Sequence, residues 1–549
     1  MSKVSIRNTC IIINDYTMGD CPILEKCLSI WDPIYHKLTP FGYYYDENER
    51  KLYIPNGYDL WKIKKELELT QHDLPIREKC DDFLKFPQIK SMAKPRDDEQ
   101  IEALKFTCGV NEYENNLYKP MLSLNLSTGK GKSFVSISTI AYFSVRSMVI
   151  TGSNTLLDQW KDEFMRYTDL KNDEILRISG SEMCNMIMSG KSEKAAKAKV
   201  FLCTHGTLRS FGERYGWNKV RELFKLLQIG LTFFDEAHTN FNNMLMIMFF
   251  TNVWKTYFVT ATPARSSWKE NVIFQNTIAK VPSIDLFKEE DKHVNVICLR
   301  WNSHPQPQTV SKLKNQYGLD INRYSEYLSM TEEYYRLVDY IMSIIENEAL
   351  KNGKKALIYI HTNTALLRTY NYIRTEMPKY AHRIGIFTSL VDKGSKRAER
   401  EKDIILSTTK SAGLGEHIEG LRITVILDDP FKSSVTTIQA LGRNREYGSF
   451  FIDCVDLGFR QLIKFFNSRY KTYEDRALNL EINNLDSYEL YKRSEMIKKK
   501  HSNDLVFPMR IIDDRFGDIN ELMPKWYKEE KEKEWIGKNG LERPMRIIP

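Results

Sequence analysis

The chain has 549 residues, of which 42% are hydrophobic and 12% aromatic, and its formal net charge at pH 7 is +8. This length predicts three or four domains of roughly 100–200 residues each. The apolar content excludes an intrinsically disordered chain. The mild excess of basic residues is compatible with a polyanionic partner, and equally with an ordinary globular protein that binds none.

Cysteine usage and apolar runs indicate the compartment. The nine cysteines include no C-x-x-C pair, which gives zinc-ribbon and iron–sulfur sites no support and favours a reducing cytosol. The first apolar run, CIII at 10–13, is too short for a signal peptide, and no stretch approaches the roughly 18 apolar residues of a membrane helix. We therefore expect a soluble cytoplasmic protein of a bacterial or host cell, without a membrane partner.

The first ninety residues read as a small α+β domain. Apolar runs predict strands at 10–15 and 51–55, whereas 22–31 and 59–69 have helical spacing. The charged, proline-containing stretch at 86–100 predicts a domain boundary.

Two series of short apolar strands, several of them separated by amphipathic helices, follow this region. The strands of the first series are expected at 121–126, 147–153, 199–205, 231–238 and 256–262, and those of the second at 356–362, 383–389, 403–409, 423–429 and 449–456. A long helix is predicted between the series, within 329–355. Two such series predict two tandem doubly wound α/β domains with mainly parallel sheets, at 91–290 and 291–456. A helical extension is expected at 457–549, with its first helix over 460–482.

The stretch NLSTGKGKSF, residues 125–134, lies between a predicted strand and a predicted helix. In that setting a glycine loop can wrap phosphates with backbone N–H groups at a helix N-terminus. Lys132 is placed to reach the β- and γ-phosphates of a nucleotide, and Ser133 to ligate Mg²⁺. Leu126 replaces the first glycine of the usual pattern, so a lysine-rich turn is the alternative. The expected cradle comprises Thr128, Gly129, Lys130, Gly131, Lys132 and Ser133.

The stretch FFDEAH, residues 233–238, supplies the second half of a nucleotide site. It is an apolar strand that ends in two adjacent carboxylates. Asp235 would hold Mg²⁺ and Glu236 would orient the attacking water. Two solvated acids at a strand end are the alternative, but that explanation is weak for a pair that follows a phosphate loop in this order.

From these motifs onward the sequence resembles the superfamily 2 helicases and translocases, whose motor consists of two RecA-like domains. Residues 95–455 carry the family's motifs in order. In the first domain the resemblance implies that Gln100 reads the adenine and that Gln159 and Thr204 contact nucleic acid. It also implies that His238, Thr260 and Thr262 couple hydrolysis to strand movement. The resemblance also places Trp160, beside Gln159, on a helix that borders the nucleic-acid track.

The second domain continues the resemblance. The stretch LIYIHTNT resembles motif IV, and DIILSTTKSAGLGEH resembles motif V, which implies that Thr408 and Thr409 lie near the backbone of a bound strand. The stretch QALGRNRE resembles motif VI, which implies that Gln439 and Arg443 face the ATP.

Two departures from the family pattern concern motifs V and VI. Motif V here reads Gly413-Leu414-Gly415, without the acid that the family usually has at the third position. In motif VI the second arginine comes one residue early, at Arg445, and Glu446 takes its usual place. We expect either Arg443 or Arg445 to act as the arginine finger.

The motif spellings are similar to those of the DNA-directed branch that contains RecG, XPB and phage UvsW. They imply an ATP- and Mg²⁺-dependent DNA helicase or translocase that acts on single-stranded, duplex or branched DNA from replication or recombination. A phage or viral origin is compatible with this resemblance. The alternatives are an RNA helicase or transcript-release factor, a duplex translocase that does not separate strands, and a nucleic-acid-binding protein with a degenerate ATPase. For residues 1–90, a DNA-binding or wedge domain and a structural domain packed on the motor have equal weight.

Overall fold

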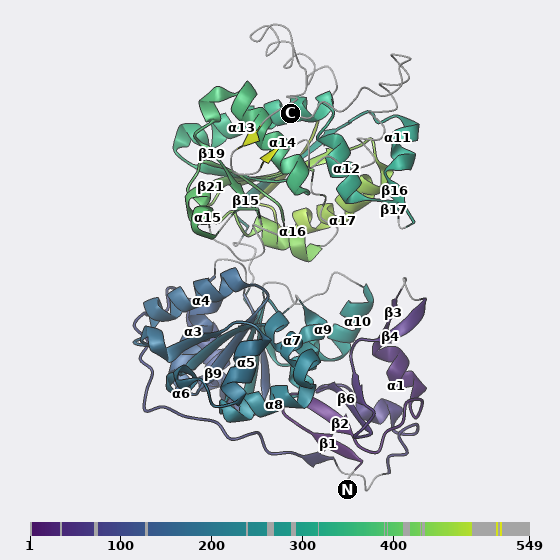
Figure 1. Cartoon of the computed structure of the whole chain (residues 1–549), viewed down its shortest axis with the longest axis vertical. Coiled ribbons are helices and arrows are strands. Elements are labelled where there is room, and N and C mark those ends of the chain that lie inside the picture. Colours follow the sequence, from purple (N-terminus) through teal and green to yellow (C-terminus); the bar gives the residue numbers. More distant parts are fainter. Residues whose placement is uncertain are drawn as a thin grey trace. The chain divides into compact units, whose positions relative to one another are not determined.

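The structure is a computed structural model, which describes residues 3–32, 36–70, 75–126, 130–237, 240–260, 268–286, 292–316, 318–388, 390–391, 393–409, 418–428, 430, 434–485, 512–513 and 517–518. The chain divides into two compact units, Met1–Glu289 and Glu290–Pro549. The description below takes each unit by itself (Figure 1).

The N-terminal residues form a five-stranded sheet in the first unit. Its order is β5 (Tyr44–Asp46), β6 (Lys51–Pro55), β2 (Cys10–Ile13), β1 (Val4–Ile6) and β7 (Ile76–Arg77). Only β7 runs parallel to its neighbour; the other pairs are antiparallel. These strands confirm the two that the sequence predicts.

Both helices predicted in this region are shorter than expected. Helix α1 spans only Pro22–Cys27, because the apolar residues after it enter a two-stranded ribbon, β3 (Ser29–Asp32) with β4 (Lys37–Pro40). The segment predicted at 59–69 forms a single 3-10 turn, η1 (Leu60–Ile63), whose first residues are capped by Asp59. In both places the apolar residues are spaced as on one face of a helix, but the chain does not form a continuous helix there.

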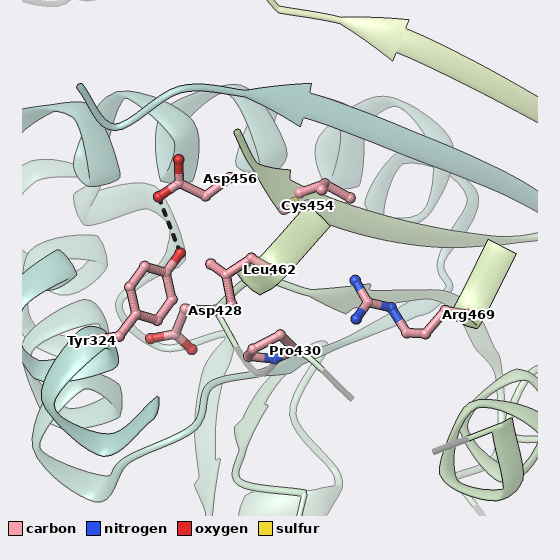
Figure 2. A pocket seen from close by; sticks show the side chains of 8 residues that line it. Tyr324, Asp428, Pro430, Cys454, Asp456, Leu462 and Arg469 are labelled. Atoms are coloured by element: carbon pink, nitrogen blue, oxygen red, sulfur yellow. Dashed lines mark hydrogen bonds between the residues drawn. The ribbon is translucent and has the colours of Figure 1, made fainter. Parts of the chain in front are cut away.

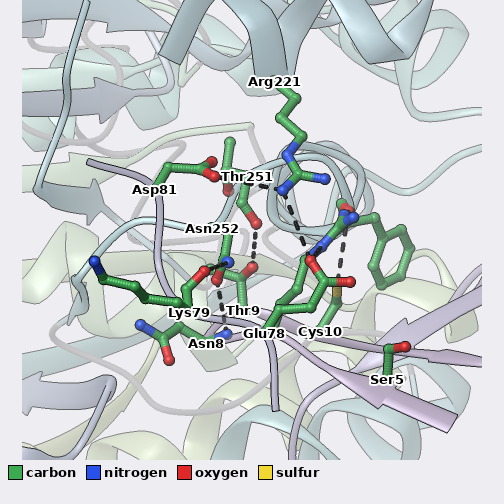
Figure 3. Close-up of polar contacts among 12 residues, drawn as sticks. Ser5, Asn8, Thr9, Cys10, Glu78, Lys79, Asp81, Arg221, Thr251 and Asn252 are labelled. Atoms are coloured by element: carbon green, nitrogen blue, oxygen red, sulfur yellow. Dashed lines mark hydrogen bonds and ion pairs between the residues drawn. The ribbon is translucent and has the colours of Figure 1, made fainter. Parts of the chain in front are cut away.

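The N-terminal sheet is fastened to the first α/β domain by the fully buried side chain of Asn252 (Figure 3). Its Oδ1 accepts from the Asn8 amide at 3.0 Å, and its Nδ2 donates to the Lys79 carbonyl at 2.8 Å. Thr9 donates to the Thr251 carbonyl beside it. Aromatic packing extends the contact: the rings of Tyr53 and Phe250 stack with centroids 5.2 Å apart.

Replacing Asn252 by alanine should lower the free energy of unfolding of the first unit by about 1–3 kcal/mol. The substitution removes a fully buried side chain together with its hydrogen bonds to the Asn8 amide and the Lys79 carbonyl, and leaving a buried polar group unsatisfied costs about 1–3 kcal/mol. Urea unfolding followed by tryptophan fluorescence measures the change. Asn243→Ala is the matched control, because among the described residues the side chain of Asn243 accepts a hydrogen bond from an exposed arginine, Arg209. Equal losses in the two variants would contradict the fastening role.

A seven-stranded sheet forms the centre of the first α/β domain. Its order is β10 (Ile175–Ile178), β11 (Val200–Thr204), β9 (Ser147–Thr151), β12 (Leu231–Asp235), β13 (Lys255–Thr260), β8 (Met121–Asn125) and β14 (Ser283–Asp285). All its ladders are parallel. The central strands are buried along their length, as expected for a parallel sheet covered on both faces. The five predicted strands are present, and β10 and β14 add the edges.

The helices of this domain connect the strands. They are α2 (Asp98–Cys108), α3 (Lys132–Phe143), α4 (Asn154–Tyr167), α5 (Ser181–Met188), α6 (Glu193–Lys197), α7 (His205–Tyr215), α8 (Trp217–Leu226), α9 (Phe241–Phe249) and α10 (Trp268–Asn276).

The second unit has a sheet of the same kind. Its order is β19 (Ile384–Phe387), β20 (Ile404–Ser407), β18 (Lys355–Tyr359), β21 (Leu421–Ile426), β22 (Ser449–Asp456), β15 (Val294–Trp301) and β23 (Asn479–Asn484), again with parallel ladders only. The five predicted strands are again present. Its helices are α11 (Pro307–Lys312), α12 (Ile321–Leu328), α13 (Glu332–Glu348), α14 (Asn363–Glu376), α15 (Lys393–Arg400), α16 (Ser434–Leu441) and α17 (Arg460–Arg476). The two sheets confirm the expected pair of doubly wound α/β domains.

The C-terminal segment differs from the continuous helix expected over 460–482. Helix α17 ends at Arg476, and β23 follows and pairs in parallel with β15. A buried ion pair fixes α17 to the sheet, since Arg469 holds Asp453 through two nitrogens at 2.8 and 2.9 Å. Residues 460–484 thus complete the second sheet instead of forming a separate extension. Within the described residues no helix is long and apolar enough to cross a membrane.

Candidate nucleotide-binding site

The glycine-rich loop connects β8 to α3, as the sequence predicts. Gly131 is the residue before the first turn of α3 and has φ 83° and ψ 36°, a left-handed conformation that glycine adopts without strain. A Cβ at this position would lie 2.3 Å from the side-chain nitrogen of Gln100. Thr128 and Gly129 of the expected cradle lie outside the described residues. The loop therefore enters the helix through a glycine that also makes room for Gln100.

Gln100, the expected adenine-reading residue, contacts the loop itself. Its side chain is buried; Nε2 donates to the Lys130 carbonyl at 3.2 Å, and Oε1 accepts from the Arg96 amide at 2.8 Å. Lys130 in turn pairs with Glu99 of the same helix at 2.9 Å. Helix α2 thus holds the backbone of the loop through Gln100, and the adenine contact stays a prediction.

The paired carboxylates lie at the carboxyl end of β12. Asp235 is the last residue of the strand; its Oδ1 accepts from the Glu236 amide at 2.9 Å and its Oδ2 from the indole nitrogen of Trp160 at 2.8 Å. Burial raises the pKa of Asp235 to about 7 and the Glu236 carboxylate adds to the rise, whereas the Trp160 hydrogen bond and the Lys132 charge oppose it. A cation placed here would hold Asp235 in its charged form.

Lys132 and Ser133 are the first two residues of α3, and the charge of Lys132 acts on Asp235. The ammonium of Lys132 donates to the Leu126 carbonyl at 3.4 Å and is near enough to Asp235 to lower its pKa. The N-terminus of α3, a lysine and a buried carboxylate suit the phosphates and Mg²⁺ of a nucleotide. Lys132 would hold the phosphates, and Ser133 and Asp235 would hold the metal.

The remaining predicted residues of the first unit have local partners. Gln159 on α4 donates to Glu163 at 2.9 Å, and Thr204 accepts from the Thr207 amide at 3.1 Å and so caps α7. Thr260 is the buried last residue of β13. His238 and Thr262 lie outside the described residues. The nucleic-acid and coupling roles of this set stay predictions.

Trp160 is the residue whose contact sequence reasoning missed. The resemblance placed it on a helix that borders the nucleic-acid track, and that role stays a prediction; the structure puts its ring in the core and its N–H on Asp235. A buried indole N–H needs a hydrogen-bond acceptor. A tryptophan on the apolar face of a predicted helix is therefore a sequence signal for an acceptor nearby, although it does not identify Asp235.

Motif VI of the second unit, residues 439–446, begins in the last turn of α16, and a buried asparagine anchors the part that follows the helix. Asn444 is fully buried; it accepts from the Thr424 hydroxyl, and its amide donates to the Phe450 carbonyl at 2.7 Å. On either side of it, Arg443 is buried and Arg445 is exposed.

Two other features of the second unit bear on the predicted residues. Glu446, at the usual place of the second arginine, pairs with Lys354 at 2.5 Å. Gln439 is buried on α16; Thr408 is buried and Thr409 half-buried just after β20.

A small pocket in the second unit is a gap in the packing of the core and not a ligand site (Figure 2). Its volume of about 10 Å³ fits one water molecule. Its carboxylates have partners: Asp428 accepts from the Ser325 hydroxyl at 2.6 Å, and Asp456 from the Ser303 hydroxyl at 2.6 Å. Asp456 also accepts from the Tyr324 hydroxyl at 3.3 Å. In the part of the chain that the structure describes, no cluster of three or more histidine, cysteine or acidic residues could hold a metal ion.

Comparisons with known proteins bear on the first unit most directly. Residues 93–265 match the family described as "Type III restriction enzyme, res subunit". The XPB helicase/translocase subunit of the transcription and repair factor IIH of Danio rerio is 22% identical over 236 residues, which cover 43% of this chain and 25% of the relative. The Rad25 sequence of Haloarcula marismortui is 28% identical over 146 residues, covering 27% and 20%. The chain thus matches a quarter or less of the length of these relatives.

Solved structures with a similar fold include UvsW of T4, with 16% identity, a TM-score of 0.33, and coverage of 88% of this chain and 99% of that one. Dbp5 of S. cerevisiae bound to RNA has 14% identity, a TM-score of 0.46, and coverage of 73% and 96%.

A glycine before the first turn of a helix, a lysine in that turn and a buried carboxylate at the end of a parallel strand are typical of a nucleotide-binding α/β domain. The family match over residues 93–265 and these relatives make the chain similar to the superfamily 2 helicases, which are nucleic-acid-dependent ATPases.

Proposed function

We propose that the protein is an ATP-dependent DNA helicase or translocase that couples hydrolysis to movement on DNA or to its unwinding. The observation that carries the proposal is the convergence of Lys132 and Glu236 on Asp235, at the end of β12 and the start of α3. A lysine at a helix N-terminus beside two carboxylates provides for phosphate binding, metal binding and water orientation in one place.

The roles of the residues in the proposed reaction follow from this arrangement. Bound Mg²⁺ would neutralise charge on the phosphates. Lys132 would bind the phosphate oxygens, Ser133 and Asp235 would hold the metal, and Glu236 would orient the attacking water. An arginine of motif VI would stabilise the charge that develops during transfer. Cycles of ATP binding and hydrolysis would then drive movement along the strand.

DNA is the proposed substrate because of the motif spellings and the relatives. The stretch ITGSNTLLDQWKDEF and the motifs TAT and QALGR are similar to those of the DNA-directed branch. The name of the Danio rerio relative describes a DNA repair helicase/translocase subunit. We propose branched replication or recombination intermediates as the preferred substrates. Phosphate contacts would supply most of the affinity, with strong salt dependence and little sequence preference.

The deciding measurement is ATP turnover without nucleic acid and with single-stranded RNA, single-stranded DNA, duplex DNA or forked DNA. We expect DNA to stimulate ATP turnover, with forked DNA giving the largest stimulation. We also expect the protein to separate the paired strands of the fork. Stimulation by RNA alone would move the protein to the RNA helicases and transcript-release factors. Stimulation by duplex DNA without strand separation would identify a duplex translocase.

The replacement of the second motif VI arginine by Glu446 supports one candidate of another class. This candidate is a nucleic-acid-binding protein with a degenerate ATPase. Binding of ATP and DNA without turnover above background would favour it.

A further inference from the structure

We propose that Trp160 is a positioning residue for the metal-binding carboxylate of Asp235, and that it ties helix α4 to the nucleotide site. The inference deepens the proposed function and rests on it, because Asp235 holds a metal only if the protein binds Mg²⁺-nucleotide.

The geometry leaves Asp235 little freedom. Its Oδ2 accepts from the Trp160 indole nitrogen at 2.8 Å, and its Oδ1 accepts from the Glu236 amide at 2.9 Å. Each carboxylate oxygen thus has a fixed donor on a different element. Trp160 is only 1% exposed, so its ring has one packed orientation. The carboxylate therefore cannot rotate without breaking a buried hydrogen bond.

The local sequence explains how Trp160 reaches the neighbouring strand. Ser153 caps α4 by accepting from the Leu156 amide at 3.4 Å, which starts the helix directly after β9. Strand β9 lies next to β12, with Ile150 opposite Phe234. The buried residues of α4 form one face over the sheet, namely Leu156, Leu157, Trp160 and Phe164. An indole on that face, in the second turn, lies over the carboxyl end of β12.

The chemistry indicates why a tryptophan is needed at this point. Residues that hold a metal ligand by hydrogen bonds set the ligand's orientation, and removing one typically lowers metal affinity by about 10- to 100-fold. Phenylalanine would keep an apolar ring but would leave the buried Oδ2 without its donor. Gln159, the preceding residue, carries the predicted nucleic-acid contact. Trp160 would then pass a shift of α4 to the metal ligand by a direct hydrogen bond.

The test uses the full-length protein and a fluorescent ADP analogue, titrated in Mg²⁺ and in EDTA. We expect Trp160→Phe to weaken Mg²⁺-dependent binding by about 10- to 100-fold and to leave binding in EDTA unchanged. Trp254→Phe is the matched control. Trp254 packs between Phe83 and Phe143 at the amino end of β13, away from the carboxylates, and its variant should bind like the wild type.

A double-mutant cycle with Asp235→Asn separates positioning from general packing. If Trp160 acts through the carboxylate, Trp160→Phe should add less than a factor of two once Asp235 is asparagine. Additive effects, or an equal loss in Mg²⁺ and EDTA, would overturn the inference. So would Mg²⁺-dependent binding that Trp160→Phe leaves intact. A wild-type protein that binds the analogue equally in Mg²⁺ and EDTA would instead reject the metal site of the proposed function, and the inference with it.

Discussion

Replacing Arg445 by alanine should lower the DNA-stimulated kcat by about 10³- to 10⁵-fold and leave ATP binding nearly unchanged, as expected for loss of an arginine finger. Arg445 is the exposed arginine of motif VI, whereas Arg443 is buried within the second unit. An exposed guanidinium can reach a phosphate without rearrangement of the motif VI loop. Single-turnover hydrolysis and nucleotide binding, measured side by side, separate the two effects.

Glu446→Gln is the matched control for this prediction. Glu446 pairs with Lys354 at a partly exposed site, and such pairs contribute about 0–1 kcal/mol. Its loss should leave kcat within about twofold of the wild type. If Arg443→Ala abolishes turnover and Arg445→Ala does not, the buried arginine is the finger. If neither variant changes the rate, the degenerate ATPase becomes the better description.

Replacing Lys132 by alanine should reduce kcat by about 10²- to 10³-fold, the usual cost of removing one charge-stabilising donor from an active site. The charge of Lys132 helps to lower the pKa of Asp235, beside the larger effect of the Trp160 hydrogen bond, so its loss also makes protonation of that carboxylate easier. Steady-state ATPase with saturating forked DNA gives the rate.

Lys194→Ala provides a comparison for Lys132→Ala. Lys194 is an exposed residue of the lysine-rich stretch at 191–199, outside the nucleotide site. We expect no change in kcat for this variant. An equal loss in both would indicate that general positive charge, and not the position of Lys132, supports turnover.

The central strands of both sheets could be predicted because strands covered on both faces are continuous apolar runs. LTFFD and LRITVI are examples, and both lie in the middle of their sheets. The edge strands β10, β14 and β23 could not be predicted in the same way, whereas the buried edge strand β19 could. Strand β23 reads NLEINN and is mostly exposed, so its sequence has no apolar run, and only pairing with β15 makes it a strand.

The site was predictable in its motifs but not in its contacts. The loop and the carboxylates have sequence patterns because each is a continuous stretch of chain. The hydrogen bond from Trp160 to Asp235 joins residues 75 positions apart, and that from Gln100 to Lys130 joins residues 30 apart. Such contacts depend on the order of the strands in the sheet, which the spacing of apolar residues does not reveal.

The attachment of the N-terminal sheet determines how the protein can be shortened. A chain that starts after residue 90 would expose Phe241 and Phe250, which now pack against Phe41 and Tyr53. It would also leave the Asn252 side chain without Asn8 and Lys79. The first ninety residues are therefore not a removable module. A force applied to these residues would be transmitted to the first parallel sheet through Thr251 and Asn252, which precede β13.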